Sequence, residues 1–157
     1  HHQKILLQPN KILLLCVFAA CSSGKVYKHF IKMPSYMWEK DHKLNFKVDI
    51  KEKLQHVNVL LAIRYDHFCP HDDIKVKVTT IQPNGQESTD DFTILLKKNG
   101  KHQGEAAANL WDLEVPITKN TNLDQIGTYE YVVENLVNEA RIIAIVDVGL
   151  IIEKVEE

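Results

Sequence analysis

The chain has 157 residues, of which 45% are hydrophobic and 25% charged, and its formal net charge at neutral pH is −2. A chain of this length and composition can bury one hydrophobic core, whereas two domains would be crowded. The slightly acidic balance argues against a nucleic-acid-binding role, which normally needs a basic surface or stripe.

The first twenty residues are typical of a secretory signal peptide. Lys4 and Lys11 precede an apolar run at residues 12–20. The run has the length of a signal-peptide apolar region and is shorter than the about 20 apolar residues that a membrane-spanning helix needs. We therefore expect this segment to be cleaved. The two histidines that open the chain are interpreted as a truncated start or a tag remnant and are set aside from fold reasoning.

The cleavage site resembles the lipobox of bacterial lipoproteins. Phe18, Ala19 and Ala20 place one apolar and two small residues directly before Cys21, and in a lipobox the sulfur of that cysteine carries a diacylglycerol. The alternative is ordinary cleavage after Ala19 or Ala20, which would leave Cys21 as a plain thiol. A short polar segment of serine and glycine follows, as a flexible tether requires, so we expect lipid attachment at Cys21.

The sequence is therefore expected to divide into a signal peptide at 1–20, a lipidated tether at 21–25 and a globular domain at 26–157. Cleavage leaves 17 basic residues against 21 acidic ones, a net charge of about −4. Loss of Cys16 with the signal peptide and acylation of Cys21 would leave Cys69 without a disulfide partner. We therefore expect the hydrophobic core alone to hold the domain together.

Alternation of apolar and polar residues dominates the remaining chain and predicts half-buried β-strands. The expected strands cover residues 44–50, 57–63, 74–79, 92–96, 111–115, 128–133 and 145–153. The strand at 57–63 is apolar on both sides and should be central. The turn residues Pro83, Asn84 and Gly85 predict a hairpin between the third and fourth of these strands.

Two connecting segments complete this expectation. Residues 98–109 are polar, contain the Asn99-Gly100 reversal and should form a surface loop. Residues 134–141 could form a turn or two of helix. About eight short strands joined by turns indicate a sandwich or barrel of antiparallel sheets. Between the sandwich and the barrel we predict the sandwich: an all-β fold with antiparallel sheets, of jelly-roll or immunoglobulin-like type.

Several motifs in order resemble the GldH-type gliding-motility lipoproteins of Bacteroidota. They are the signal segment that ends at a cysteine, Trp38 ahead of the strand at 44–48, and the run Gly127-Thr128-Tyr129, Glu134-Asn135, Ala140-Arg141 and Asp147-Val148-Gly149-Leu150. The likeness extends, with gaps, from the signal to about Lys154. The chain departs from the family at 101–109, where relatives are rich in tryptophan and glycine, and in the turn after Arg64, where an Asn-rich turn with Tyr-Pro would be expected.

The resemblance implies a lipid-anchored envelope protein that acts with other proteins of a motility and secretion apparatus, without catalysis and without a cofactor. The membrane contact would be the lipid at Cys21. Residues 22–25 lack the acidic run that surface-exported lipoproteins of this bacterial group usually carry. We therefore expect an outer-membrane anchor with the domain facing the periplasm. Similar proteins also occur in bacteria that do not glide, so fold and anchor carry over better than motility does.

One segment has the residue types of a metal site. His67, Cys69, His71 and Asp73 would share one face of an extended strand, and their imidazole, thiolate and carboxylate groups suit zinc. They are weak candidates, because ligands two apart in a row rarely surround one point and Pro70 breaks the extended geometry. A polar loop with one unpaired thiol is the other interpretation. No base that would activate Cys69 and no common catalytic motif is evident, so we expect no enzyme activity.

Aromatic residues define a second candidate site. Trp38 and Trp111, with Tyr36, could form a binding surface on which sugar rings stack, which would make the protein a carbohydrate-binding outer-membrane lipoprotein. Packing in the core is the commoner fate of such side chains. At the strand ends, Arg64, Arg141 and Asp147 could take part in an ion pair.

Overall fold

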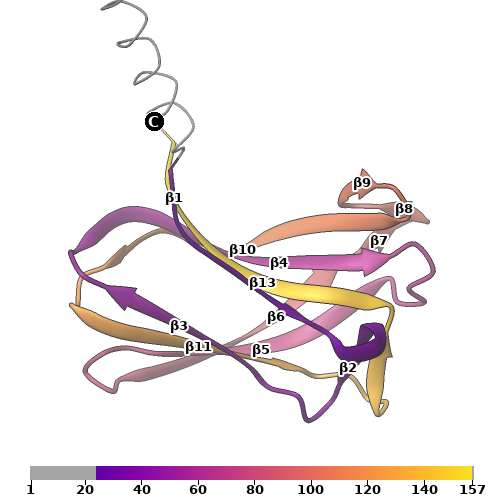
Figure 1. Ribbon diagram of the computed structural model, residues 1–157, viewed down its shortest axis with the longest axis horizontal. Coiled ribbons are helices and arrows are strands. Elements are labelled where there is room, and N and C mark those ends of the chain that lie inside the picture. Colours follow the sequence, from indigo (N-terminus) through magenta and orange to yellow (C-terminus); the bar gives the residue numbers. More distant parts are fainter. Residues whose placement is uncertain (1–23, 157) are drawn as a thin grey trace, which may run out of the picture.

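Two antiparallel β-sheets pack face to face, and their inner faces form the core (Figure 1). The larger sheet contains, in spatial order, β1 (Lys25–Lys32), β13 (Ile145–Lys154), β4 (Leu54–Asp66), β10 (Leu110–Leu123) and β9 (Glu105–Ala107). The smaller sheet contains β3 (Leu44–Ile50), β11 (Gly127–Asn135), β5 (Asp73–Ile81) and β6 (Glu87–Leu95). The computed structural model describes residues 24–156, so the predicted signal peptide and the predicted lipid site at Cys21 lie outside the described residues.

Two short strand pairs and a 3₁₀ turn complete the described chain. β2 (Met37–Glu39) pairs with β12 (Arg141–Ile143), and β7 (Lys97–Lys98) pairs with β8 (Lys101–His102). The 3₁₀ turn η1 (Pro34–Tyr36) links β1 to β2. Residues 24–156 contain no helix long and apolar enough to span a bilayer.

The antiparallel β-sandwich predicted from the sequence is confirmed. Strands with period-two alternation do bury the side chains of one face in the core and expose those of the other. In β3 the side chains alternate strictly between buried and exposed, with Leu44, Phe46, Val48 and Ile50 buried. β4 pairs with β13 on one side and with β10 on the other, as its apolar character on both faces predicted. The β5–β6 hairpin is also confirmed, and Gly85 takes a positive φ of 87° in its turn.

The expected number of about eight strands is too low, since thirteen are described between residues 24 and 156. β1 was not predicted, because its side chains are mostly exposed on both faces and its sequence therefore shows no alternation of apolar and polar residues. It nevertheless pairs with β13 along almost its whole length through backbone hydrogen bonds. Because β1 begins at Lys25, the last residue of the predicted tether already belongs to the domain.

A glycine in the last strand makes room for β1. The ring of Phe30 lies against Gly149, and a Cβ atom at that position would come within 2.6 Å of the ring. Phe30 and Gly149 are also direct partners in the β1–β13 register. This contact gives a physical reason for the glycine within the run Asp147-Val148-Gly149-Leu150, because any side chain there would push Phe30 off the sheet.

Three segment predictions are wrong. Residues 134–141 form no helix, because β11 continues to Asn135 and the amide Nδ2 of Asn135 donates to the backbone oxygens of Trp38 (3.3 Å) and Glu39 (3.2 Å). Residues 98–109 are not only a loop, since they contain β8 and β9. The strand expected at 111–115 continues to Leu123, because a register shift after Pro116 accommodates the proline within the strand.

Candidate functional site

Two of the predicted site residues, His67 and Trp111, come together at one end of the sandwich. His67 lies in the turn after β4, and Trp111 lies near the start of β10. Between them is His102 from β8, whose ring stacks on Trp111 with 4.2 Å between centroids and 10° between planes. The His67 ring lies 5.0 Å from the His102 ring. With Tyr65 at the end of β4, these residues form what we call the aromatic cluster.

Hydrogen bonds fix the protonation of the cluster. The hydroxyl of Tyr65 donates to the backbone oxygen of Leu96 at 2.9 Å. That hydroxyl has one proton, so the Nδ1 of His102, 3.1 Å away, must donate to the Tyr65 oxygen. Burial, assisted by His67 and Lys97, lowers the pKa of His102, which keeps the ring neutral at pH 7. Burial also raises the pKa of Tyr65 to about 12, so the phenol stays protonated.

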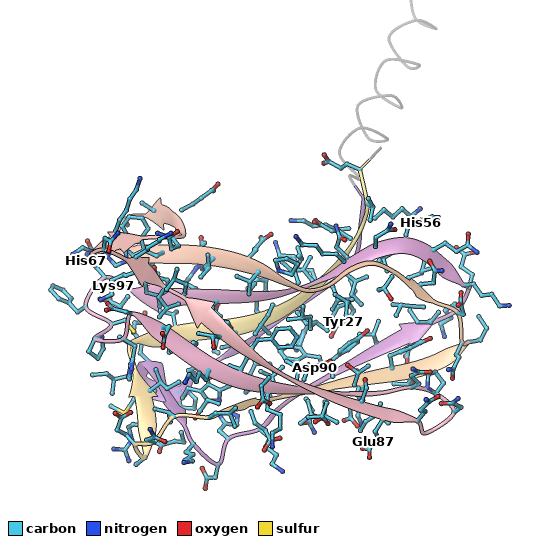
Figure 2. All side chains as sticks on the ribbon, turned by 180° about the vertical axis from the view of Figure 1, so that it is seen from behind. Tyr27, His56, His67, Glu87, Asp90 and Lys97 are labelled. Carbon is cyan, nitrogen blue, oxygen red and sulfur yellow. The ribbon has the colours of Figure 1, made fainter. Side chains whose placement is uncertain are left out.

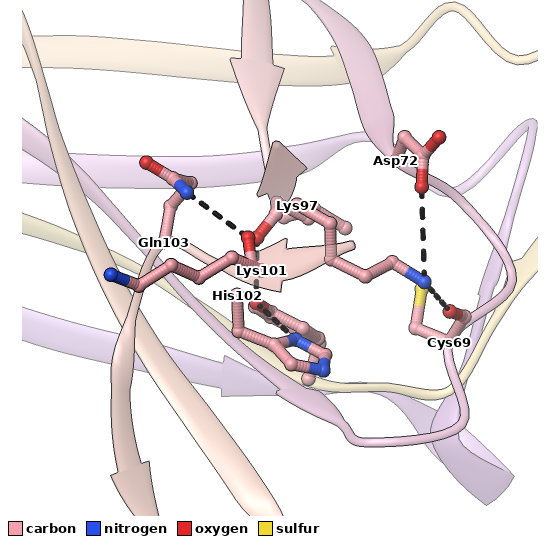
Figure 3. Close-up of polar contacts among 8 residues, drawn as sticks. Cys69, Asp72, Lys97, Lys101, His102 and Gln103 are labelled. Atoms are coloured by element: carbon pink, nitrogen blue, oxygen red, sulfur yellow. Dashed lines mark hydrogen bonds and ion pairs between the residues drawn. The ribbon is translucent and has the colours of Figure 1, made fainter. Parts of the chain in front are cut away.

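Beside the cluster, Cys69 is enclosed by the turn that follows β4 (Figure 3). The ammonium group of Lys97 donates to the backbone oxygen of Cys69 at 2.9 Å and lies 3.9 Å from a carboxylate oxygen of Asp72. The Cys69 side chain is only 1% exposed. Burial raises its pKa, although a hydrogen bond from the backbone of His71 and the charge of Lys97 act in the opposite direction. A thiol nucleophile needs the opposite shift.

The structure does not bring the weak metal candidates together. His67, Cys69 and His71 lie in the turn between β4 and β5, and Asp73 is the first residue of β5. The segment turns because Asp66 accepts backbone hydrogen bonds from Phe68 and Cys69, each at 2.9 Å. Cys69 therefore points into the protein while His67 stays exposed. Among residues 24–156, no three His, Cys, Asp or Glu side chains gather in a way that could hold a metal ion.

The two tryptophans have different environments. Trp38 is fully buried, and its Nε1 donates to the backbone oxygen of His42 at 2.9 Å. Its assignment to a binding surface is therefore wrong, since a ring enclosed in the core offers no face to a ligand. Trp111 is half-buried, and His102 covers one of its faces. Its Nε1 is directed at Nδ1 of His67 at 3.4 Å, so the indole is also engaged at its edge.

Both arginines at strand ends make ion pairs, but not with Asp147. Arg64 binds both carboxylate oxygens of Asp112, at 2.6 and 3.2 Å, and Arg141 binds Glu39 at 2.9 Å. Asp147 lies opposite Arg64 in the β13–β4 register, is 8% exposed, and has one carboxylate oxygen without a hydrogen-bond partner in the described part of the chain. Of the three residues that could have taken part in an ion pair, Asp147 therefore forms none within residues 24–156.

This environment predicts a pH-dependent effect of replacing Asp147. Burial raises the pKa of Asp147 above 3.8, although Arg64 opposes the shift. At pH values between the pKa of the unfolded state and the higher pKa of the native state, the native state binds the proton more tightly. The free energy of unfolding therefore falls as pH rises through this range. Ionised Asp147 therefore destabilises the fold at neutral pH. Asp147→Asn should raise the melting temperature at pH 7 by roughly 3 °C, about 1 kcal/mol for one poorly solvated acceptor.

The effect should vanish at about pH 2, where the carboxyl group is protonated in both states. Differential scanning fluorimetry of both proteins across this pH range measures it. An identical difference between the two proteins at every pH would show that the carboxylate charge is not the cause.

Comparisons with known proteins match the chain to one protein family and to several solved structures that resemble it only distantly. The carbohydrate-binding module CBM28, specific for non-crystalline cellulose, is 13% identical, with a TM-score of 0.41 over 82% of this chain and 73% of that chain. CBM35 from Cellvibrio japonicus Abf62 is 8% identical, with a TM-score of 0.35 over 83% and 99%. At these values neither likeness bears on what this chain binds. No curated protein matches the sequence. The family model described as GldH lipoprotein matches residues 25–152.

Proposed function

Because the chain belongs to the GldH lipoprotein family, we propose that it is a lipid-anchored envelope protein and a non-catalytic component of a gliding-motility and protein-secretion apparatus. The proposed anchor is Cys21 in the outer membrane, with the domain on the periplasmic side. A diacylglycerol thioether and an N-terminal acyl chain would supply the two or more chains that stable membrane attachment requires.

The position of Gly24 limits how the domain can stand on the membrane. The Gly24 backbone oxygen accepts a hydrogen bond from Lys154 at 2.8 Å, which fixes the start of the domain on β13. Gly24 is the third residue after Cys21, so the chain between them can reach at most roughly 11 Å. The lipid would therefore hold this part of the sandwich close to the bilayer.

The aromatic cluster lies far from that attachment point. Val57 of β4 pairs with Lys154 beside Gly24, and nine further residues of β4, roughly 30 Å of strand, lead to Asp66. Figure 1 shows β7, β8 and β9 gathered at the end of the sandwich away from the start of β1. The cluster end therefore remains accessible to other proteins when the opposite part is held at the membrane.

One observation carries the proposal of a docking surface: Phe68 is 83% exposed at this end. The turn that presents it is held by the hydrogen bonds of Asp66 and by Lys97. The backbone of His67 also donates to Asn109 at 2.9 Å, which joins the turn to the segment 98–109. We call residues 66–72 and 98–109 the docking end. An aromatic side chain presented to water by a fixed turn suits a protein contact, where aromatic anchors contribute most of the binding energy.

Site-specific photo-crosslinking in intact cells tests this proposal. A photoreactive phenylalanine analogue at Phe68 should form adducts that mass spectrometry identifies as envelope proteins. The same analogue at Asn45, exposed on the outer face of β3, is the matched control and should form few. Equal adducts at both positions, or none at Phe68, would contradict docking through this end.

The chemistry of the cluster supports the non-catalytic part of the proposal. Burial keeps the Cys69 thiol protonated, and His102 Nδ1 is engaged with Tyr65. The alternative function is sugar binding on an aromatic platform. Trp38 is buried in the core, so this platform would consist of Trp111, with one face covered, and Tyr36, which is exposed on η1. Protein docking is therefore the function that this end of the molecule supports best.

A further inference from the structure

The inner face of the smaller sheet changes from apolar to polar along the β5–β6 hairpin. Its inward-facing cross-strand pairs run in the order Ile74–Ile94, Val76–Phe92, Val78–Asp90 and Thr80–Ser88. Asp90 and Ser88 are exposed, so this end of the hairpin extends beyond the apolar core. The inner face of the sheet is therefore polar and open to solvent here, as a binding site for a polar molecule requires.

These polar side chains surround a cavity of about 300 Å³ between the two sheets. The smaller sheet contributes Thr80, Ser88 and Asp90, and β10 of the larger sheet contributes Thr118 and Thr121. Figure 2 labels Asp90 on β6, the edge strand beside which the cavity lies. We call this cavity the inter-sheet pocket. Its volume is at the lower end of the roughly 300–1,000 Å³ that ligand pockets have, which suits one small molecule.

An unpartnered phenol lines the pocket. Tyr131 is only 3% exposed, yet its hydroxyl has no hydrogen-bond partner within residues 24–156. Among the described residues, the Asp147 oxygen is the one completely enclosed side-chain atom that lacks a partner, so the Tyr131 hydroxyl is not sealed inside protein. It therefore opens onto the pocket. The neighbouring Tyr129 differs, because its hydroxyl already accepts a hydrogen bond from the Gln125 backbone at 3.0 Å.

Burial keeps the Tyr131 hydroxyl available as a neutral donor, because desolvation raises its pKa far above neutral pH. A buried phenol normally finds a partner within the protein. A ligand hydroxyl or carbonyl oxygen in the pocket would supply that partner.

The opposite wall of the pocket comes from an irregular part of β10. Its register against β4 shifts between Pro116 and Thr118, between Thr118 and Thr121, and again before Leu123. Such bulges re-aim side chains that a regular strand would alternate between faces. Here they place two threonines, rather than two apolar residues, along the pocket.

The charges of the lining narrow the class of ligand. The lining contains two carboxylates, Asp90 and Asp124, and no lysine, arginine or histidine. An anionic ligand would meet like charge without a compensating cation. Hydroxyl and amide groups instead match the alternating donors and acceptors of a polyol. We propose that the inter-sheet pocket binds a neutral polyhydroxylated molecule, such as one sugar ring. This site is separate from the docking end and does not depend on the proposed function.

Titration of the full-length protein with D-glucose, D-galactose and N-acetyl-D-glucosamine tests the proposal by nuclear magnetic resonance. At least one of these sugars should give saturable shifts of the backbone amides of Thr80 and Ser88. D-glucuronate, which carries a carboxylate, should bind at least about tenfold more weakly, since the lining offers it no cation. Failure of all three neutral sugars to saturate, or tighter binding of D-glucuronate, would overturn the proposal.

Tyr131→Phe separates a ligand-binding role from a structural one. The variant should bind the sugar about fivefold more weakly, the effect of one lost hydrogen bond. Its melting temperature should not fall, because the hydroxyl has no partner in the protein. Tyr27→Phe is the matched control, since Tyr27 lies on β1 outside the pocket lining, and it should bind like the parent protein. Unchanged sugar affinity in Tyr131→Phe, or a clear loss of its stability, would contradict the assignment.

Discussion

Replacing Cys21 by serine is expected to remove the protein from the outer-membrane fraction. A serine hydroxyl cannot take the diacylglycerol that the Phe18-Ala19-Ala20-Cys21 sequence predicts. Each buried methylene group of such a chain contributes about 0.8 kcal/mol to membrane attachment, so losing the chains should change localisation completely rather than partially. Membrane fractionation followed by detergent-phase partition measures the effect.

Cys69→Ser is the control for this experiment. Cys69 is a buried thiol in the turn after β4, and its replacement should leave the protein in the membrane fraction. If Cys21→Ser remained in the outer membrane, or if both variants were released alike, the proposed attachment would be wrong.

Trp38→Ala is expected to cause the largest loss of stability among single substitutions in the core. The side chain is fully enclosed, and truncation would leave a cavity and also remove the hydrogen bond to His42. Such substitutions cost about 3–5 kcal/mol, a large part of the roughly 5–15 kcal/mol by which domains are stable. Chemical denaturation followed by circular dichroism gives the change in the free energy of unfolding.

Trp111→Ala is the comparison for this measurement. Its ring is half-buried, stacks on His102 and packs against the edge of the core, so about half the loss seen for Trp38 is expected. Equal losses for the two variants would show that Trp38 does not have the central place in the core assigned to it.

The sequence predicted the strands that have one wet and one dry face, because only there does burial leave a pattern in the residues. β3 and β11 alternate in this way, and β4 carries the doubly apolar pattern of a central strand. β1 left no such pattern, since backbone hydrogen bonds to β13 hold it while Lys28, His29 and Phe30 stay exposed. The pattern of side chains in the sequence therefore cannot predict an edge strand that is held by backbone hydrogen bonds alone.

Tertiary contacts explain the wrong prediction for residues 134–141. Local composition permitted a turn of helix there, but Asn135 directs its amide at the backbone of β2, and Arg141 pairs with Glu39 on the same strand. Both partners lie about a hundred residues earlier in the chain, at separations of 96 to 102. No window of local sequence contains that information.

The candidate site could be predicted only in part, for a similar reason. His67 and Trp111 stood out by residue type, whereas Tyr65 and His102 did not. The one available signal was the Asn99-Gly100 reversal, which folds β8 back so that His102 reaches the end of β4. The metal hypothesis assumed an extended segment, and the hydrogen bonds that Asp66 accepts turn that segment instead.

Intact-mass analysis of the protein isolated from cell envelopes tests the central claim most directly. We expect a chain that begins at Cys21 and carries the additional mass of a diacylglycerol and an N-terminal acyl group. A chain with an unmodified thiol at that position, or one cleaved elsewhere, would mean that nothing fastens this sandwich to the membrane by lipid.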